Sequence, residues 1–149
     1  MTAFAPNRIF ARLIILLTQS IKLIWASPNT VLGLFLGMFG LLTGGRVQLR
    51  RNCLEFHGGI VKWLLHKMPV NPIALTLGHT ILGLDENSLA VARDHEHVHV
   101  RQYEHWGPFF LPAYFGFSFV AWCRGGDAYR DNPFESEAYA ADKLRRTQN

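Results

Sequence analysis

The stretch RDHEHVHVRQYE, residues 93–104, decides how this chain is interpreted, because it contains the pattern HExxH at positions 95 to 99. On a helix, side chains four positions apart lie one turn above each other, so His95 and His99 are expected on one face. Asp85 precedes the stretch as a candidate N-cap, and the residues from there to Tyr103 are good helix formers. We therefore expect one helix that presents two imidazoles side by side.

Two imidazoles at this spacing are typical zinc ligands. Zn²⁺ binds imidazole nitrogen at about 2.0–2.1 Å, and a catalytic site needs a third protein ligand and a water. Glu96 is expected to reach that water without binding the ion, which is the position of a general base. One Zn²⁺ per chain is the expected cofactor. The alternative is a solvated, histidine-rich helix face that holds no metal.

Three downstream residues compete to be the third ligand. His105 falls where the longer pattern HExxHxxGxxH has its last histidine, but the glycine of that pattern is replaced by Gln102. Glu135 and Glu137 lie in NPFESEA, residues 132–138, where an Asn-Pro pair starts a new helix and acidic residues suit its positive end. We expect Glu135 to be the ligand, with Glu137 and His105 as alternatives.

HExxH at 95–99, followed by Glu135-x-x-Ala138, resembles the gluzincin metallopeptidases of membranes, such as the CAAX prenyl proteases and related bacterial heat-shock peptidases. In their second motif, Glu-x-x-Ala-Asp, the first glutamate binds zinc, so the resemblance implies that role for Glu135. Tyr139 replaces the aspartate of that motif, and Asp142 can substitute for its supporting contact. The two blocks are also similar to small uncharacterised bacterial proteins with HExxHVxQ and NPxExEA. The resemblance covers roughly residues 76 to 142.

Other polar residues are candidates for supporting roles around the metal. Tyr114 and Tyr129 can donate a hydrogen bond to the oxyanion of a tetrahedral intermediate. Gln102 lies about two turns after His95, and Asn132 can hold an imidazole by its second nitrogen. Asp94 and Asp131 are candidates for the same support. An ordinary structural hydrogen bond is the alternative role for each of these residues.

The segments before the HExxH helix are typical of a small sheet. Residues 47–50 alternate weakly, residues 53–57 continue as a strand to a Gly-Gly turn, and residues 60–66 fit a short helix or strand. Residues 73–83, rich in β-branched and apolar side chains, predict one strand beside the helix, where a zincin-like fold has an edge strand that receives an extended peptide. We therefore expect a mainly helical α+β domain over residues 46–149.

The amino-terminal residues 1–45 contain two hydrophobic runs, 9–25 and 31–42, separated by Ser-Pro-Asn. Each run is slightly shorter than the roughly 20 residues that cross a bilayer, so we expect a membrane-inserted or re-entrant helical hairpin. Gly33 and Gly37, with Gly40 near the same face, would let the two helices approach closely. A pair of buried core helices is the alternative.

The arginines at the ends of this hairpin predict its orientation. A tight turn would place Arg8 and Arg12 on the same side as Arg46, Arg50 and Arg51. The positive-inside rule makes that side cytoplasmic. We therefore expect the bacterial inner membrane as the location, with the metal site facing the cytoplasm. A secretory signal that ends near Ala26 is disfavoured because a second apolar run follows at once.

A second apolar segment, residues 109–122, separates the two motifs and is strongly aromatic. Trp106, Tyr114 and Trp122 are candidates for an aromatic belt at a membrane interface. A hydrophobic helix packed over the HExxH helix is an equally good interpretation. In both cases the metal would lie near an apolar surface.

Composition excludes several other classes of protein. The chain has 149 residues, enough for one domain, and its 49% hydrophobic and 17% charged residues exclude a disordered chain. Its 2 cysteines form no CxxC pair, which excludes a disulfide scaffold and a thiolate zinc ribbon. The net charge of +4 comes from basic residues that flank apolar runs, so we expect no nucleic-acid partner.

Together these features predict a membrane-associated zinc metallopeptidase that hydrolyses peptide bonds by metal-activated water. Its expected partners are the lipid membrane, a peptide or protein substrate and other membrane subunits. The alternative is a non-catalytic, zinc-binding membrane protein that acts as an assembly or interaction subunit.

Overall fold

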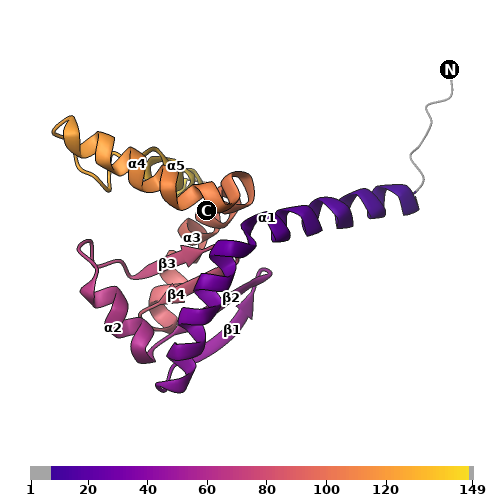
Figure 1. The fold of residues 1–149 in the computed structure, drawn as a ribbon, viewed down its shortest axis with the longest axis horizontal. Coiled ribbons are helices and arrows are strands. Elements are labelled where there is room, and N and C mark those ends of the chain that lie inside the picture. The colour runs from indigo at the N-terminus through magenta and orange to yellow at the C-terminus, as the bar shows by residue number, and fades with distance from the viewer. Residues whose placement is uncertain (1–7, 148–149) are drawn as a thin grey trace.

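The computed structural model describes residues 8–147, so residues 1–7 of the predicted hairpin lie outside the described residues. The elements in chain order are α1 (Arg8–Leu42), β1 (Arg46–Arg50), β2 (Cys53–His57), α2 (Gly59–Lys67), β3 (Ala74–Leu77), β4 (Thr80–Gly83), α3 (Glu86–Trp106), the short 3₁₀ helix η1 (Gly107–Phe109), α4 (Phe110–Cys123) and α5 (Pro133–Arg146). The predicted α+β class, mainly helical with a small sheet, is confirmed (Figure 1).

The sheet has four strands in the order β1-β2-β4-β3. β1 and β2 form an antiparallel hairpin whose two turn residues, Arg51 and Asn52, both have positive φ, as a tight two-residue hairpin turn requires. β2 and β4 are parallel, and β3 pairs antiparallel with β4 at the edge. The prediction of one strand over residues 73–83 is wrong, because Gly78 adopts a φ of 62° and turns the chain back on itself.

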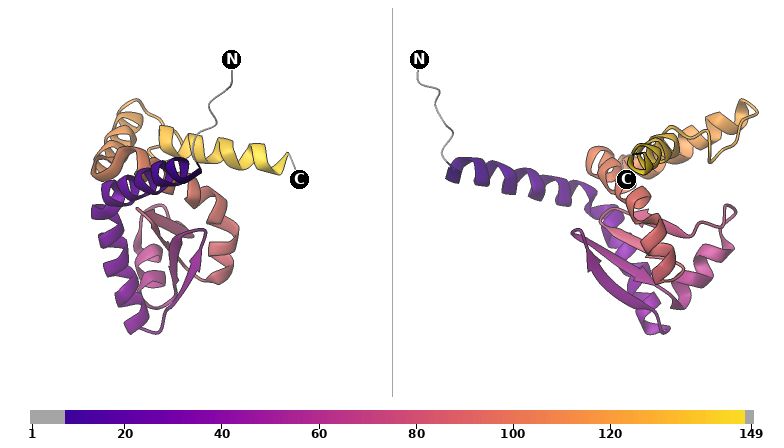
Figure 2. Two further views of the ribbon diagram at one scale, coloured as in Figure 1. Left: turned by 90° about the vertical axis from the view of Figure 1, so that its right-hand side faces the viewer. Right: turned by 180° about the vertical axis from the view of Figure 1, so that it is seen from behind.

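Helices cover both faces of this sheet (Figure 2). On one face, Phe56 and Leu82 pack with Ala26 of α1 and Leu65 of α2 in a buried apolar cluster. On the other face, Ile81 and neighbouring buried side chains pack against Leu89 and other residues of α3. The sheet therefore holds α3 in place from one side while α1 and α2 close the core from the other.

The predicted hairpin at the amino terminus is wrong, because α1 is one helix of 35 residues with Pro28 inside it. Proline has no N–H and crowds the carbonyl of the residue four positions earlier, which here is Ile24. Ser27 donates its hydroxyl to that Ile24 carbonyl at 2.7 Å, so the carbonyl keeps a hydrogen bond. The helix bends in this region and continues (Figure 1), as proline kinks in long helices do.

The two parts of α1 have different surroundings. Residues 8–24, which we call the arm, extend away from the sheet, whereas the part after Pro28 lies along it (Figure 1). A Cβ added at Gly33 would lie 1.7 Å from Oγ1 of Thr80, and one at Gly37 would lie 2.5 Å from the ring of Phe56. These glycines therefore allow contact between helix and sheet, and not between two helices of a hairpin.

This arrangement also changes the predicted domain boundary and orientation. The second part of α1 belongs to the same core as the sheet, so residue 45 does not separate two packing units. Arg12 and Arg46 lie near opposite ends of the bent helix and not on one side of a hairpin. The hairpin argument for a cytoplasmic metal site therefore loses its basis.

α1 is long and apolar enough to cross a membrane, by the length and composition of residues Ile9–Leu42. Of the described arm side chains, Phe10, Leu13, Leu17 and Ile24 are among those that are largely exposed. α4 is also only partly covered, because Phe110 is buried whereas Phe115, Phe119 and Trp122 are exposed. The 109–122 segment thus forms a helix that packs through one side and leaves the other open.

Candidate metal centre

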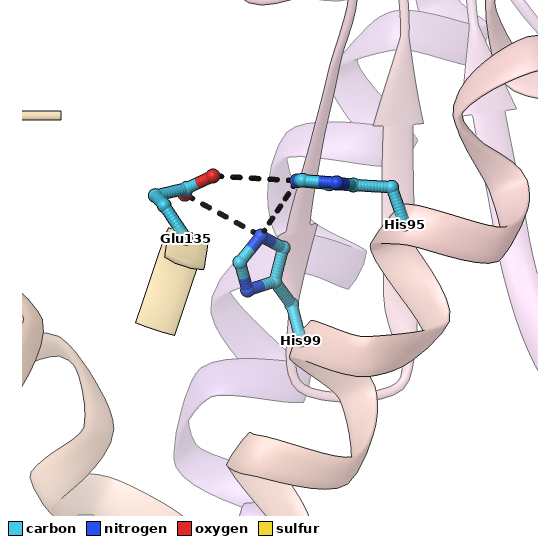
Figure 3. Close-up of side chains that lie close together, drawn as sticks. All are labelled: His95, His99 and Glu135. Carbon is cyan, nitrogen blue, oxygen red and sulfur yellow. Dashed lines mark hydrogen bonds and ion pairs between the residues drawn. The ribbon is translucent and has the colours of Figure 1, made fainter. Parts of the chain in front are cut away.

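α3 begins directly after Asp85, as the sequence predicted, and continues past Tyr103 to Trp106. The side chain of Asp85 accepts a hydrogen bond from the backbone N–H of Ser88 at 2.7 Å, which caps the first turn. Gly107 ends the helix with a φ of 56°, a conformation that favours glycine. Between these points His95 and His99 lie one turn apart and face the same way (Figure 3).

α5 carries the third residue of the site, and the buried Asn132 fixes where this helix begins. Its carbonyl oxygen Oδ1 accepts a hydrogen bond from the backbone N–H of Phe134 at 3.0 Å. Its Nδ2 donates to the Tyr114 carbonyl at 2.9 Å and to Ser118 Oγ at 2.8 Å. Asn132 therefore ties the start of α5 to α4, and does not contact an imidazole as predicted. Glu135 follows in the first turn of α5.

The side chains of His95, His99 and Glu135 converge on one point (Figure 3). The two Nε2 atoms are 3.2 Å apart, and the carboxylate oxygens of Glu135 lie 3.3 Å from Nε2 of His95 and 3.4 Å from Nε2 of His99. One ligand atom from each residue lies within 4.8 Å of the other two, so this group can hold a metal ion.

The outer nitrogens of both imidazoles face hydrogen-bond acceptors. Nδ1 of His95 lies 3.1 Å from Oδ2 of Asp142, and Nδ1 of His99 lies 2.8 Å from Oε1 of Gln102. An acceptor at Nδ1 places the proton there and leaves the lone pair of Nε2 directed at the shared point. The contact expected of Asp142 is therefore present, and Gln102 supports His99. Tyr139, at the aspartate position of the gluzincin motif, lies beside the His95 ring.

The donor set suits a zinc ion. Glu135 is only 3% exposed, and its buried Oε2 atom accepts no hydrogen bond from the described residues, although it lies 3.3 Å from Nε2 of His95. A buried carboxylate oxygen that accepts no hydrogen bond is costly unless a cation completes its coordination. Two imidazole nitrogens and one carboxylate oxygen are the ligands of many catalytic zinc sites.

The two alternative third ligands lie elsewhere. Glu137 is exposed and accepts a hydrogen bond from Nε2 of Gln102 at 2.8 Å. It therefore helps to orient Gln102, whose Oε1 faces Nδ1 of His99. His105 is exposed at the end of α3, and its ring lies next to that of Trp106. The structure thus brings Glu135 to the imidazoles and leaves Glu137 and His105 outside the group.

Glu96 lies beside this group in a buried position. It is 5% exposed, and its Oε2 accepts a hydrogen bond from Thr76 Oγ1 on β3 at 2.7 Å. Burial raises the pKa of Glu96 above its ordinary value, although the charge of His99 and the Thr76 hydrogen bond act in the opposite direction. A raised pKa makes a carboxylate a better proton acceptor at neutral pH.

Burial and neighbouring charges also shift the pKa values of His95 and Glu135. Burial opposes the charged form of His95, but its contact with Glu135 and the nearby carboxylates raise its pKa above the ordinary value. Burial alone would raise the pKa of Glu135, but the bond to His95, the charge of His99 and the hydroxyls of Tyr114 and Tyr129 lower it. The surroundings therefore favour an ionised carboxylate and a positive charge between the imidazoles.

The two tyrosines predicted as oxyanion donors both lie beside Glu135. Tyr114 donates its hydroxyl to Oε1 of Glu135 at 2.8 Å. Burial, followed by the charge of Glu135, raises the pKa of Tyr114 and of Tyr129 far above the ordinary value, so both phenols stay protonated. In this structure Tyr114 orients the carboxylate ligand.

We call His95, His99 and Glu135 the metal group. An apolar cavity of about 290 Å³ adjoins it, and Glu96, His99 and Glu135 lie in the cavity wall. Its other walls come from the loop before β3, from β3 and from α4. This size is at the lower end for small-molecule sites, which are typically lined by apolar side chains with a few polar groups.

Sequence reasoning missed Thr76 as a partner of Glu96 and the loop residues Met68 to Pro72 as a cavity wall. The prolines of that loop predicted only the end of a helix, and no local pattern shows that it faces α4. The predicted roles of two acids at the imidazoles are wrong: Asp94 pairs with Arg51, and Asp131 accepts the backbone N–H of Asp127.

Comparisons with protein families, with curated proteins and with solved structures found no match to this chain. The zincin-like fold and the resemblance to gluzincins therefore stay predictions, and a functional proposal depends on the geometry of the site.

Proposed function

We propose that this chain is a membrane-associated zinc metallopeptidase. The observation that carries the proposal is the convergence of His95, His99 and Glu135, with Glu96 in the wall of the same cavity. A structural zinc site is normally closed by four protein ligands, whereas a catalytic site keeps one position open. Three protein ligands beside a cavity favour the catalytic interpretation.

His95, His99 and Glu135 would hold the ion. A bound zinc ion supplies a Lewis acid, which lowers the pKa of a coordinated water to about 7 and polarises a substrate carbonyl. Glu96 would serve as the proton acceptor beside the ion, because Thr76 donates a hydrogen bond to one of its carboxylate oxygens and the group is desolvated. In its protonated form the same side chain would donate a proton to the departing amine.

The substrate backbone would lie along β3, which is the edge strand nearest the site. Ile73 accepts a backbone hydrogen bond from Leu84 on the β4 side. Because alternate residues of an antiparallel pair point toward the partner strand, Ala74 and Thr76 point their backbone groups toward the free edge. Their side chains also line the cavity. An extended peptide can therefore pair with β3 and pass Glu96.

Membrane association is supported by the arm, where apolar side chains such as Phe10, Leu17 and Ile24 are largely exposed. Exposed side chains on several sides of a helix suit lipid better than a protein partner, which covers one stripe. If the arm spans a bilayer, Arg8 and Arg12 lie at its amino-terminal end, Lys22 lies at its other end, and Arg46, Arg50 and Arg51 follow in the body of the protein. Because more basic residues lie on the body side, the positive-inside rule would favour a metal site that faces the cytoplasm.

The test of the proposal compares the Glu96→Gln protein with the natural one in lipid nanodiscs. We expect the natural protein to bind one zinc per chain and to cleave unfolded proteins, and Glu96→Gln to keep the zinc and lose the cleavage. Glu86→Gln, on the first turn of the same helix and exposed, is the matched control and should keep both. Equal cleavage by all three proteins, or none, would overturn the proposal.

A second candidate is a non-catalytic assembly subunit that zinc stabilises. It is favoured by the outer face of α1 after Pro28, where Val31, Phe35, Met38 and Leu42 are exposed. Exposed apolar faces of this kind often mark an interface. In that case zinc would bind without any cleavage that depends on Glu96, and the natural protein would co-purify with a membrane partner.

A further inference from the structure

We infer that the cavity beside the metal group selects a large apolar side chain in the residue that flanks the cleaved peptide bond. This inference rests on the proposed peptidase function and names the class of substrate. It depends on three observations: the chemistry of the cavity wall, its size, and its position beside both Glu96 and the edge strand β3.

The cavity wall has two chemically different parts. Among the described residues that line it, the acidic and histidine side chains are Glu96, His99 and Glu135, and all three lie at the metal end. The remainder is mainly aliphatic and aromatic, as in Val70, Leu111 and Phe115. A charged substrate side chain would lose its hydration there without a partner, whereas an apolar one would gain by burial.

The size of the cavity sets what can enter. Its volume of about 290 Å³ is ample for one large apolar side chain of a substrate. Val70 and Phe115 line the cavity and are also exposed, at 50% and 65%, so its wall reaches the protein surface at these two residues. A side chain can therefore enter while its backbone stays outside.

The position of the cavity ties it to the cleaved bond. Ala74 and Thr76 contribute to its wall from the edge strand, and Thr76 also holds Glu96. A peptide paired with β3 directs alternate side chains to the same face of the sheet. The residue next to the bond that Glu96 serves is thus the one whose side chain reaches the cavity.

The experiment digests a peptide library from a denatured proteome with the zinc-loaded, full-length protein in nanodiscs. Sequencing of the new termini should show Leu, Phe, Met or Ile at one fixed position beside the cut. Matched synthetic peptides with Phe, Asp or Lys at that position then give kcat/KM. We expect the Asp and Lys peptides to be cleaved about 100-fold more slowly than the Phe peptide.

A substitution in the cavity wall tests the assignment of the position. Val70→Glu places a charge where the cavity wall reaches the protein surface, on an exposed loop where folding tolerates it. It should reduce the preference for Phe over Lys at least about 10-fold. Val91→Glu, the same change at an exposed position on α3 that does not line the cavity, should leave the preference unchanged.

Binding provides a readout that does not need turnover. Zinc-loaded Glu96→Gln should bind the Phe peptide at least about 10-fold more tightly than the Asp peptide, and Val70→Glu in that background should remove the difference. Cleavage that depends on Glu96 but ignores the flanking residue would overturn this inference and leave the peptidase proposal intact. If no such cleavage occurs, the peptidase proposal fails, and equal binding of both peptides would then overturn the apolar cavity assignment as well.

Discussion

The metal group and the arm of α1 differ in what surrounds their side chains. Around the metal group, each imidazole and carboxylate is held by a neighbour on another turn or another helix, such as Asp142 for His95 and Tyr114 for Glu135. On the arm, side chains such as Leu13 and Leu17 are exposed. Contacts within the protein therefore fix the side chains of the metal group, whereas the exposed side chains of the arm can contact a partner outside the protein.

This difference predicts which residues determine metal binding and which determine membrane binding. Metal binding should depend on a few buried polar contacts and not on the arm. Membrane binding should depend on the apolar character of the arm and not on any one contact. The predictions below separate the two properties, beginning with the largest expected effect.

Replacing a metal ligand should abolish metal binding and leave membrane binding unchanged. His99→Ala removes one of the two imidazoles and also the partner of Gln102, so we expect the zinc content to fall from about one per chain to none. His105→Ala is the control, since His105 lies outside the group. Elemental analysis of both purified proteins measures the effect, and zinc retained by His99→Ala would contradict the assigned site.

Charges in the arm should have the reverse effect. Each lysine at the centre of a membrane helix costs about 2.5–3.5 kcal/mol, so Ile14→Lys with Leu17→Lys should release the protein from membranes. Zinc content should stay the same, because these residues do not touch the metal group. Val91→Lys with Leu144→Lys, on exposed positions of α3 and α5, is the control. Sedimentation with vesicles would show release only for the arm variant.

Loss of the carboxylate that supports His95 should weaken zinc binding less than loss of a zinc ligand. Asp142→Asn keeps the size of the side chain but removes its charge, and we expect zinc affinity to fall about 10- to 100-fold. Asp131→Asn is the control, because Asp131 bonds a backbone N–H away from the site. Competition with a zinc chelator measures both affinities. Equal affinities would mean that Asp142 does not orient the imidazole.

The second part of α1 should behave as core and not as membrane anchor. A Cβ at position 37 would press on the ring of Phe56, so Gly37→Ala should lower the free energy of unfolding by about 1–3 kcal/mol. Gly116→Ala, on α4 where a Cβ meets nothing within 4 Å, should not destabilise the protein. Denaturant unfolding in detergent compares the two, and an unchanged midpoint for Gly37→Ala would contradict the packing.

The smallest effect is expected where the arm meets the body. Lys22 donates to Glu104 at 2.9 Å, and His79 lies on the other carboxylate oxygen. Burial alone would raise the pKa of Glu104, but these contacts lower it below the ordinary 4.5. A lowered pKa stabilises the fold above pH 4.5, and the stabilisation is lost as the pH falls through the lower value.

The stability difference between the natural protein and Glu104→Gln tests this contact. We expect about 0.2–1 kcal/mol at pH 7, as for other partly exposed ion pairs, and a smaller difference at pH 3. Denaturant unfolding at both pH values measures it. A difference that does not change with pH would show that the ion pair contributes nothing.

The sequence predicted the metal group well because its signals are local or paired. HExxH fixes two residues on one helix face, and Asp85 marks the start of that helix as its N-cap. The Asn-Pro pair before Glu135 likewise marks the start of α5. Such signals need only the neighbours in the chain, so they can be read without a structure.

The predictions that failed concern how elements meet. Pro28 was interpreted as the turn of a hairpin, but the hydroxyl of Ser27 and the anchoring of Asn29 to the Gly107 carbonyl let the helix continue across it. The glycine at 78 was interpreted as part of a strand, but its positive φ makes a turn. In the first case the local sequence allows two outcomes, and the contact with Gly107 selects one; beside the turn at Gly78, His79 donates its backbone N–H to the Thr30 hydroxyl of α1 at 3.0 Å.

The amino-acid sequence alone determined that a helix presents two imidazoles and that a later helix offers glutamates near its start, because helix periodicity and capping act over a few residues. Only the tertiary structure decided which glutamate reaches the imidazoles, that Thr76 holds Glu96, and that an apolar cavity opens beside them. These features arise from contacts between residues that are distant in the chain, and no local spacing encodes their distances.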